Sequence, residues 1–283
     1  MRIHKVTILI LFVSIFSTSF SQDYTSGVFK KPLCMFDLNF GYAAPAFDFA
    51  GSSLRDFYNF SGYGMNTGYN TNFTTKFGVV NFKEGQLRAY FTIAYAQFNG
   101  SENRAYNIGG FIKQGWPHSG LKDTSVLYNP QTDLKDTAGT SSIMLYSPFL
   151  ALGAEIAFYT DRERKSIINF GIDFNVTTLW GKIYDQPSHK DEIYNNINQN
   201  NRLGLGMNLG YSYRVVDMLG LTVGTRLQFS NLFYKKSDEV TDAGDLWLDD
   251  AADATVNKYL NQNRVIGFFG IYGGVTFYIG GKK

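Results

Sequence analysis

The sequence is short of cysteine and of charge, and each shortage excludes a class of protein. Cys34 is the single cysteine among 283 residues, so no internal disulfide can form. Charged residues make up 18% of the chain, whereas about 25% is usual in soluble globular domains. The formal net charge of +2 is too small to indicate a nucleic-acid partner. The composition therefore argues against a disulfide-rich secreted domain, a nucleic-acid-binding protein and an ordinary soluble surface.

Helical periodicity is also missing after the first 21 residues, and strict alternation takes its place. In 203–215, LGLGMNLGYSYRV, one set of alternate positions is large and apolar, and the other holds glycines, Asn208, Ser212 and Arg214. Because a strand projects successive side chains to opposite faces, this stretch predicts a strand with one apolar and one small, polar face. Eight such segments occur, over 35–44, 72–82, 86–98, 143–160, 166–181, 203–215, 219–234 and 264–280.

The N-terminus has the pattern of an export signal. Arg2 and Lys5 precede an apolar run over 6–16, and the small residues Ser19 and Ser21 follow it. A transmembrane helix is the competing interpretation, but it needs about 20 apolar residues, so the run is too short. We therefore expect a signal peptide over 1–21, cleaved after Ser21, and no lipid attachment at Cys34.

Long and short connections alternate between the eight segments. The long ones cover 45–71, 99–142, 182–201 and 235–263, and the short ones cover 83–85, 161–165 and 216–218. This alternation is typical of an up-and-down antiparallel meander whose long loops all lie at one end. Outer-membrane barrels have short periplasmic turns and long extracellular loops. We therefore predict four long extracellular loops and three short periplasmic turns.

The choice of the inward face decides the fold class. In a soluble β-sandwich or lipocalin-like barrel, the apolar faces would fill the core. In a bilayer every backbone polar group must be paired within the protein, so strands can span it only as a closed barrel. An eight-stranded barrel is just wide enough inside for side chains to fill it. We therefore predict an all-β, eight-stranded antiparallel transmembrane barrel over 35–283, preceded by an N-terminal periplasmic segment over 22–34.

In this barrel the polar faces meet inside. They carry seven charged residues: Asp37, Lys76, Arg88, Glu155, Asp173, Arg214 and Arg226. An unpaired charge in so confined a space is costly, so we expect these charges to pair and to plug the lumen. The pairs could be Asp37–Arg226, Glu155–Arg88 or other combinations, because the strand register is not visible in the sequence.

Aromatic residues near the segment ends predict two interfacial girdles. They are Tyr42, Phe73, Phe82, Tyr95, Phe98, Tyr146, Trp180, Tyr211, Tyr213, Phe233, Phe277 and Tyr278. The competing explanation is the ordinary preference of aromatic residues for strands.

With its export signal, eight alternating segments and alternating connections, the chain resembles the small outer-membrane β-barrels of the OmpA/OmpX type. The ending GGVTFYIGGKK also resembles the aromatic-rich last strand that the barrel-assembly machinery reads in this group, although Tyr278 is followed by five further residues. The resemblance implies an outer-membrane location and the barrel domain alone, without a peptidoglycan-binding domain.

Two features of the sequence bear on catalysis and metal binding. His118, next to Ser119, and His189 lie in predicted loops, and adjacent residues on a loop are not the positioned nucleophile and base that a lipid-modifying enzyme requires. Carboxylates of the last long loop, among them Asp242, Asp245, Asp249 and Asp250, could hold Ca²⁺. They lack the spacing of an EF-hand, so we expect a solvated acidic loop, no metal and no cofactor.

These observations favour a non-enzymatic outer-membrane barrel with a structural or surface-interaction role. The alternative is a small porin-like or solute-binding transport barrel, and a lipid-modifying enzyme ranks third. The expected partners are outer-membrane lipid and lipopolysaccharide, the barrel-assembly machinery during insertion, and an extracellular ligand of the long loops.

Overall fold

The computed structural model describes residues 28–51, 62–100, 141–185, 193–235, 248, 250–251 and 263–280. The predicted signal peptide over 1–21, both loop histidines and most of the acidic loop lie outside these ranges. Within them, no helix is long and apolar enough to cross a membrane.

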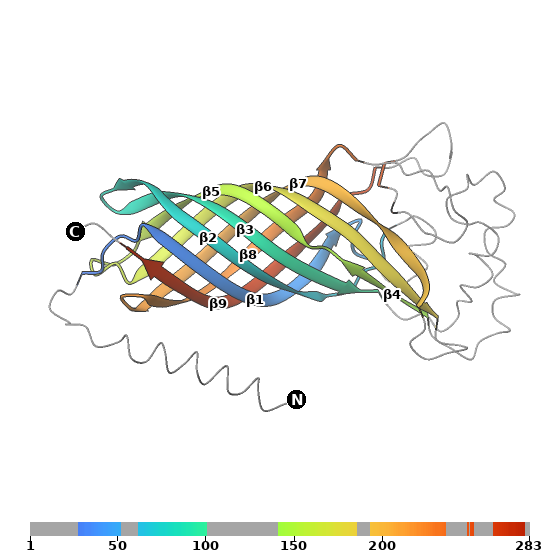
Figure 1. Ribbon diagram of the computed structural model, residues 1–283, viewed down its shortest axis with the longest axis horizontal. Coiled ribbons are helices and arrows are strands. Elements are labelled where there is room, and N and C mark those ends of the chain that lie inside the picture. Colours follow the sequence, from blue (N-terminus) through green and yellow to red (C-terminus); the bar gives the residue numbers. More distant parts are fainter. Residues whose placement is uncertain are drawn as a thin grey trace, which may run out of the picture.

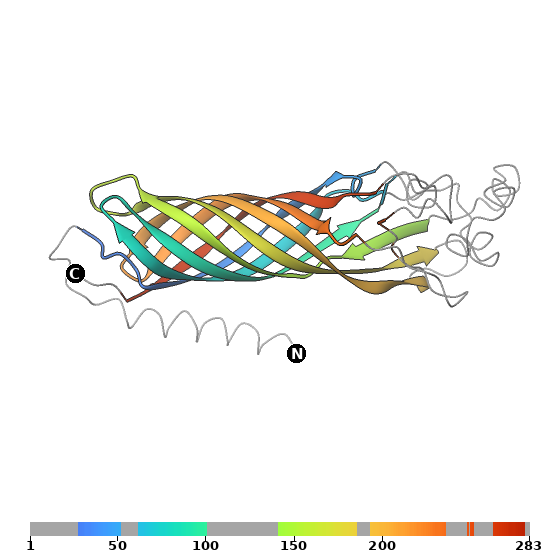
Figure 2. The same ribbon diagram turned by 90° about the horizontal axis from the view of Figure 1, so that it is seen from above.

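The described chain is a single antiparallel sheet that closes on itself (Figures 1 and 2). Its strands are β1 (Cys34–Phe47), β2 (Gly68–Phe82), β3 (Gly85–Asn99), β4 (Ser141–Tyr146), β5 (Phe149–Tyr159), β6 (Ser166–Asp185), β7 (Ile193–Val216), β8 (Leu219–Phe233) and β9 (Ile266–Ile279). The first and last strands pair along their whole length, from Cys34 opposite Ile279 to Phe47 opposite Ile266. This pairing closes the ring, so the predicted barrel is confirmed.

Nine strands form a ring of eight because β4 and β5 both lie between β3 and β6. The sequence predicts one segment over 143–160, but the strand is interrupted at Ser147 and Pro148. Proline has no N–H to donate to a ladder. The Ser147 N–H donates to the Ala96 carbonyl at 2.8 Å, and the Pro148 carbonyl accepts from the Thr178 N–H at 2.9 Å. The wall therefore remains hydrogen-bonded across the interruption.

Alternation sends apolar side chains outward and polar ones inward, as predicted. On β1, Leu38, Phe40 and Tyr42 are 54%, 62% and 76% exposed, whereas Asp37 and Asn39, on the alternate positions, are each 3% exposed. On β6, Phe174 is exposed and its neighbour Asp173 is buried. Outward apolar faces on a closed sheet suit acyl chains rather than water.

Several strands extend past their predicted segments, and β6 and β7 are the longest of them. β6 has 20 residues and β7 has 24. β7 begins at Ile193, so the predicted long loop over 182–201 is wrong, and only 186–192 separates the two strands. The tract 195–201, NNINQNN, lacks apolar alternation, yet it pairs with β6. About 9–11 residues cross a bilayer, so these polar ends extend past the apolar band.

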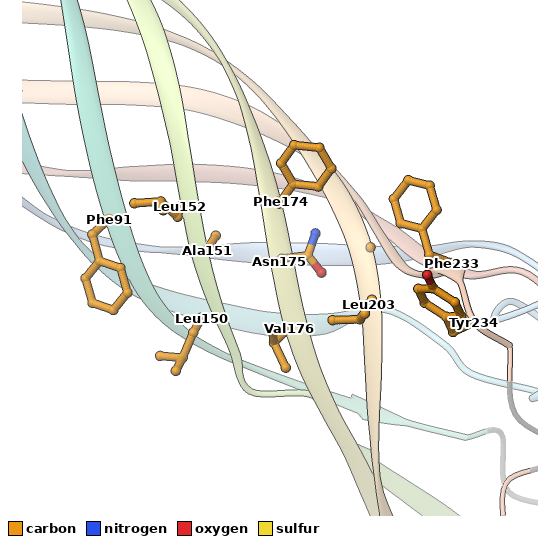
Figure 3. A pocket seen from close by; sticks show the side chains of 11 residues that line it. Phe91, Leu150, Ala151, Leu152, Phe174, Asn175, Val176, Leu203, Phe233 and Tyr234 are labelled. Carbon is orange, nitrogen blue, oxygen red and sulfur yellow. The ribbon is translucent and has the colours of Figure 1, made fainter.

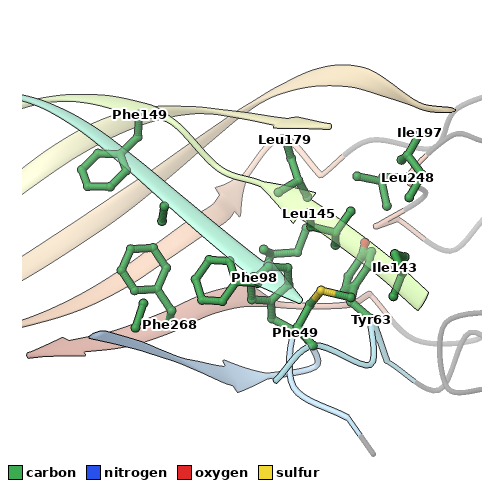
Figure 4. Packing of buried hydrophobic residues seen from close by; sticks show 14 of the residues in the cluster. Phe49, Tyr63, Phe98, Ile143, Leu145, Phe149, Leu179, Ile197, Leu248 and Phe268 are labelled. Atoms are coloured by element: carbon green, nitrogen blue, oxygen red, sulfur yellow. The ribbon is translucent and has the colours of Figure 1, made fainter. Parts of the chain in front are cut away.

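The interior is not polar throughout, which corrects a second expectation. In the half nearer the long connections, an apolar cluster fills the ring (Figure 4). It includes Phe49, Phe98, Leu145, Phe149 and Phe268. Phe98 and Tyr278 were predicted to lie in the interfacial girdles, but they are 0% and 2% exposed. Phe98 occupies the same face of β3 as Arg88, an even number of residues away, so its position follows from strand geometry.

Candidate functional site

The lumen is the candidate functional site, and its first ion-pair cluster surrounds Glu155. The Lys76 ammonium lies 2.8 Å from Glu155 Oε2 and 3.0 Å from Asp37 Oδ2, and Arg88 Nη1 lies 3.1 Å from Glu155 Oε1. Asn169 donates its amide to Glu155 Oε2 at 3.1 Å. Arg88 and Glu155 are directly opposite in the β3–β5 register. The ladder itself therefore places this pair.

The second cluster surrounds Asp173. Arg226 on β8 donates from Nη1 and Nη2 to the two carboxylate oxygens of Asp173 at 2.9 and 2.7 Å. The Tyr90 hydroxyl donates to Asp173 Oδ2 at 2.7 Å, and the Asn208 amide donates to the Tyr90 oxygen at 2.8 Å. Gly206 lies against the Arg226–Asp173 pair, where any side chain would collide with it. The suggested combination Asp37–Arg226 does not occur, because each residue has a nearer partner.

Arg214, the seventh predicted lumen charge, lies apart from both clusters at the short-turn end. Its guanidinium lies 4.8 Å from the ring centroid of Phe29 and 4.6 Å from that of Tyr278. It donates to the backbone oxygens of Lys30, at 2.6 Å, and Asp217. The six remaining predicted charges are three carboxylates and three cations, so the central lumen is electrically balanced.

Residues 28–33, here called the N-terminal strap, cross the short-turn mouth of the barrel. The Phe29 N–H donates to the Glu163 carbonyl at 2.8 Å, and Gln86 donates its amide to the Pro32 carbonyl at 2.8 Å. The Lys31 ammonium donates to the backbone oxygens of Phe82, Lys83 and Gly85. Burial, and then the charge of Arg164, lower the pKa of Lys31. With Arg214, the strap contacts all three short turns.

The long-connection mouth is closed by a different device. Arg202 Nε lies 2.9 Å from Asp250 Oδ2, and Arg202 Nη2 donates to Asp250 Oδ1 at 3.1 Å and to the Leu248 carbonyl at 2.6 Å. The Asn231 amide donates to Asp250 Oδ2 at 2.7 Å. Arg202 and Asp250 are both 1% exposed. The polar contacts hold a segment of the last long connection inside the mouth.

This finding corrects the expectation of a solvated acidic loop at Asp250, whose carboxylate is buried against Arg202. Asp242, Asp245 and Asp249 lie outside the described residues. In the part of the chain that the structure describes, no group of His, Cys, Asp or Glu could hold a metal ion. Arg202 is not among the predicted lumen charges, because it borders the tract 182–201, which the sequence predicts as a loop. Its even spacing from Asn208 on one strand face was the available signal.

A groove lies on the outside of the wall, away from the lumen. Its volume is about 490 Å³, and it is lined by residues of β3, β5, β6, β7 and the end of β8 (Figure 3). Outward apolar side chains, among them Phe91, Leu152 and Phe174, form most of its lining. It therefore presents no arrangement of nucleophile and base.

A row of aromatic rings crosses the outside of the barrel near the long connections. Neighbouring centroids lie 6.3 Å apart for Phe40–Tyr69, 6.3 Å for Tyr69–Tyr95, 6.4 Å for Tyr95–Tyr146 and 5.4 Å for Tyr146–Trp180. Near the short turns, Phe82 and Phe158 lie 5.9 Å apart. Rings with one wet and one dry side suit the two membrane interfaces.

Comparisons with known proteins found distant similarities of fold. No family model matches the sequence, and no curated protein matches it. Neisserial surface protein A is 13% identical, with a TM-score of 0.40 over 90% of this chain and 98% of that chain. Ail, the attachment invasion locus protein of Yersinia pestis, is 8% identical, with a TM-score of 0.35 over 86% and 99%. The outer membrane protein OprG from Pseudomonas aeruginosa is 9% identical, with a TM-score of 0.36 over 89% and 97%.

Because these similarities are distant, the chain's own geometry assigns its class. A closed antiparallel ring of eight positions, an apolar exterior and a balanced set of buried charges define a small outer-membrane β-barrel. The resemblance drawn from the sequence is thereby confirmed at the level of the fold.

Proposed function

We propose that this outer-membrane barrel is closed and non-enzymatic, with a structural or surface-interaction role. The observation that carries the proposal is the pairing of the central lumen charges: Lys76, Arg88 and Arg226 each contact a buried carboxylate. Removing one partner of a buried pair costs about 3–5 kcal/mol. An ion that crossed the lumen would have to separate such pairs, which supports a non-conducting resting state.

The closure of both mouths also supports a non-conducting barrel. The N-terminal strap covers the short-turn mouth, and the Arg202–Asp250 pair with the apolar cluster fills the other. A plugged scaffold leaves the long connections as the surface on which an extracellular ligand would act. Outer-membrane lipid and lipopolysaccharide would contact the apolar exterior, and the barrel-assembly machinery would insert the chain.

Planar-bilayer recordings test the closed lumen. The purified barrel, inserted at high protein-to-lipid ratio beside an open porin as a positive control, is expected to show no steady current steps. The double variant Arg88→Ala with Glu155→Ala removes one complete pair and should produce brief openings. Glu163→Gln, on an exposed turn, should remain silent. Reproducible steps from the wild-type protein would overturn the proposal in favour of a transport barrel.

The absence of enzymatic activity needs a separate test. The expected result is that His118→Ala and His189→Ala leave the lipid A and phospholipid profiles of the host membrane unchanged, and that the wild-type chain also leaves them unchanged when compared with a deletion strain. A lipid species that depends on the chain and disappears in either variant would contradict the non-enzymatic role.

A further inference from the structure

A small polar cavity lies in the lumen. Its volume is about 30 Å³, and its lining comes from the inward faces of β1, β2, β3, β5, β7, β8 and β9. The lining is polar and includes Asp37, Lys76 and Glu155 from the first ion-pair cluster, and Tyr90 and Arg226 from the second. The cavity therefore lies where the two clusters approach each other.

Three side-chain oxygens of residues that line this cavity have no hydrogen-bond partner among the described residues. They are Asp37 Oδ1, Asn39 Oδ1 and Asn208 Oδ1, and their residues are 3%, 3% and 9% exposed. The other polar atoms of these side chains are engaged. Asp37 Oδ2 contacts Lys76, and the amide groups of Asn39 and Asn208 donate to neighbouring side chains. Buried acceptors without donors are rare in native proteins, and a bound water or ion is one of the explanations for them.

Each of the three oxygens belongs to a different hydrogen-bonded network. Asp37 belongs to the Glu155 cluster and Asn208 to the Asp173 cluster. Asn39 donates to Asn72 Oδ1 at 2.9 Å, and Asn72 also accepts from Thr74 at 3.5 Å. A single occupant of the cavity can therefore contact all three networks.

We propose that this cavity is a specific water site, and that its water joins the three networks into one. Water fits the chemistry because the oxygens need donors. The volume suits about two molecules, since one water needs at least about 10–15 Å³. Two waters supply four O–H donors for three acceptors. This inference does not depend on the role proposed above.

A monovalent cation is the competing occupant, and the surrounding charge opposes it. The Lys76 ammonium lies 3.0 Å from the same Asp37 carboxylate that the cation would share. The central charges already balance, so an added cation would be an uncompensated charge in a confined space. A neutral donor avoids this cost.

Crystallography of the wild-type barrel distinguishes the two occupants. Crystals grown in sodium salt and soaked in rubidium salt are compared near the rubidium absorption edge. The proposal expects electron density within hydrogen-bond distance of all three oxygens, with no anomalous peak. An anomalous peak in the cavity would overturn it in favour of a cation, and an empty cavity would overturn it outright.

A double-mutant cycle tests whether the water couples the networks. Asn39→Leu and Asn208→Leu each remove one acceptor, on strands that share no direct hydrogen bond here. The transition temperature for loss of the folded band on unboiled gels is measured for each single variant and for the pair. Shifts that are not additive are expected.

The control combines Asn39→Leu with Ser212→Ala. The Ser212 and Thr222 hydroxyl oxygens lie 2.7 Å apart, and Ser212 belongs to none of the three networks and does not line the cavity. The shifts of this pair should add. Additive shifts in both pairs would contradict coupling through water. The crystallographic test uses the wild-type chain, so it decides the proposal even where a leucine variant fails to assemble.

Discussion

Substitution of Glu155 by Gln is the sharpest test of the lumen network, because one carboxylate there serves two cations. Its side chain has no exposed surface, and it contacts Lys76 at 2.8 Å and Arg88 at 3.1 Å. After Glu155→Gln, Lys76 keeps Asp37, but Arg88 faces an amide and loses its carboxylate. Breaking a buried pair at one end costs about 3–5 kcal/mol, so we expect a loss of that size in the free energy of unfolding.

The assay is reversible urea unfolding in detergent micelles or lipid vesicles, followed by gel mobility and tryptophan fluorescence. The matched control is Glu163→Gln, which removes the carboxylate of an exposed pair with Lys165. Exposed pairs contribute about 0–1 kcal/mol, so this variant should unfold close to wild type. A second arm combines Glu155→Gln with Arg88→Met and should recover part of the loss, since no unpaired cation remains.

Two results would refute this reasoning. One is a Glu155→Gln variant as stable as the Glu163→Gln control, which would mean that the lumen charges are hydrated and interact weakly. The other is a double variant with Arg88→Met that is less stable than Glu155→Gln alone, which would show that burial of the unpaired guanidinium is not the source of the loss.

Three further predictions concern a glycine, the strap and a turn. Gly206→Ala should displace the adjacent ion pair and cost about 1–3 kcal/mol in urea unfolding, whereas Gly273→Ala, whose added methyl group would make only ordinary van der Waals contacts, should be neutral or slightly stabilising. Arg214→Ala removes two cation–π contacts of about 0.5–2 kcal/mol each, so amide exchange in the strap should accelerate about tenfold while global stability changes less. The pKa of Asp161 is lowered because its carboxylate, although partly buried, accepts hydrogen bonds from backbone N–H groups of its turn. Its stabilisation of the turn should therefore persist above about pH 3.9 and disappear as the pH falls through the folded-state pKa. Amide exchange at Lys165 and Ser166, which donate to this carboxylate, should approach that of the Asp161→Asn variant only in acid.

The barrel could be predicted from the sequence because apolar and polar residues alternate in each of the segments that form its wall. The inversion of faces also followed, since inward positions such as Asp37 and Asp173 alternate with large apolar neighbours. Register could not be predicted, because period-2 patterns fit any even shift of one strand against the next. The partners of Lys76 and Arg226 therefore became visible only in the assembled ring.

Other features were hidden for different physical reasons. The polar start of β7 has no apolar alternation, because it lies past the bilayer and needs none. The apolar filling around Phe98 follows the inward face of the strand, but aromatic residues at strand ends suit an interface equally well. Asp250 is far along the chain from Arg202, and nothing local in an acidic tract indicates which carboxylate is buried.

The N-terminal strap has a consequence for the order of assembly. Its anchors include the Ile279 carbonyl, which accepts from the Leu33 N–H at 3.1 Å, and the turn carbonyl of Glu163. These groups come together only when the last strand has met the first, although the strap itself is synthesised before every strand. Residues 28–33 can therefore dock only after the ring of strands has closed. Protection of the Phe29 amide from exchange would then report the completion of insertion.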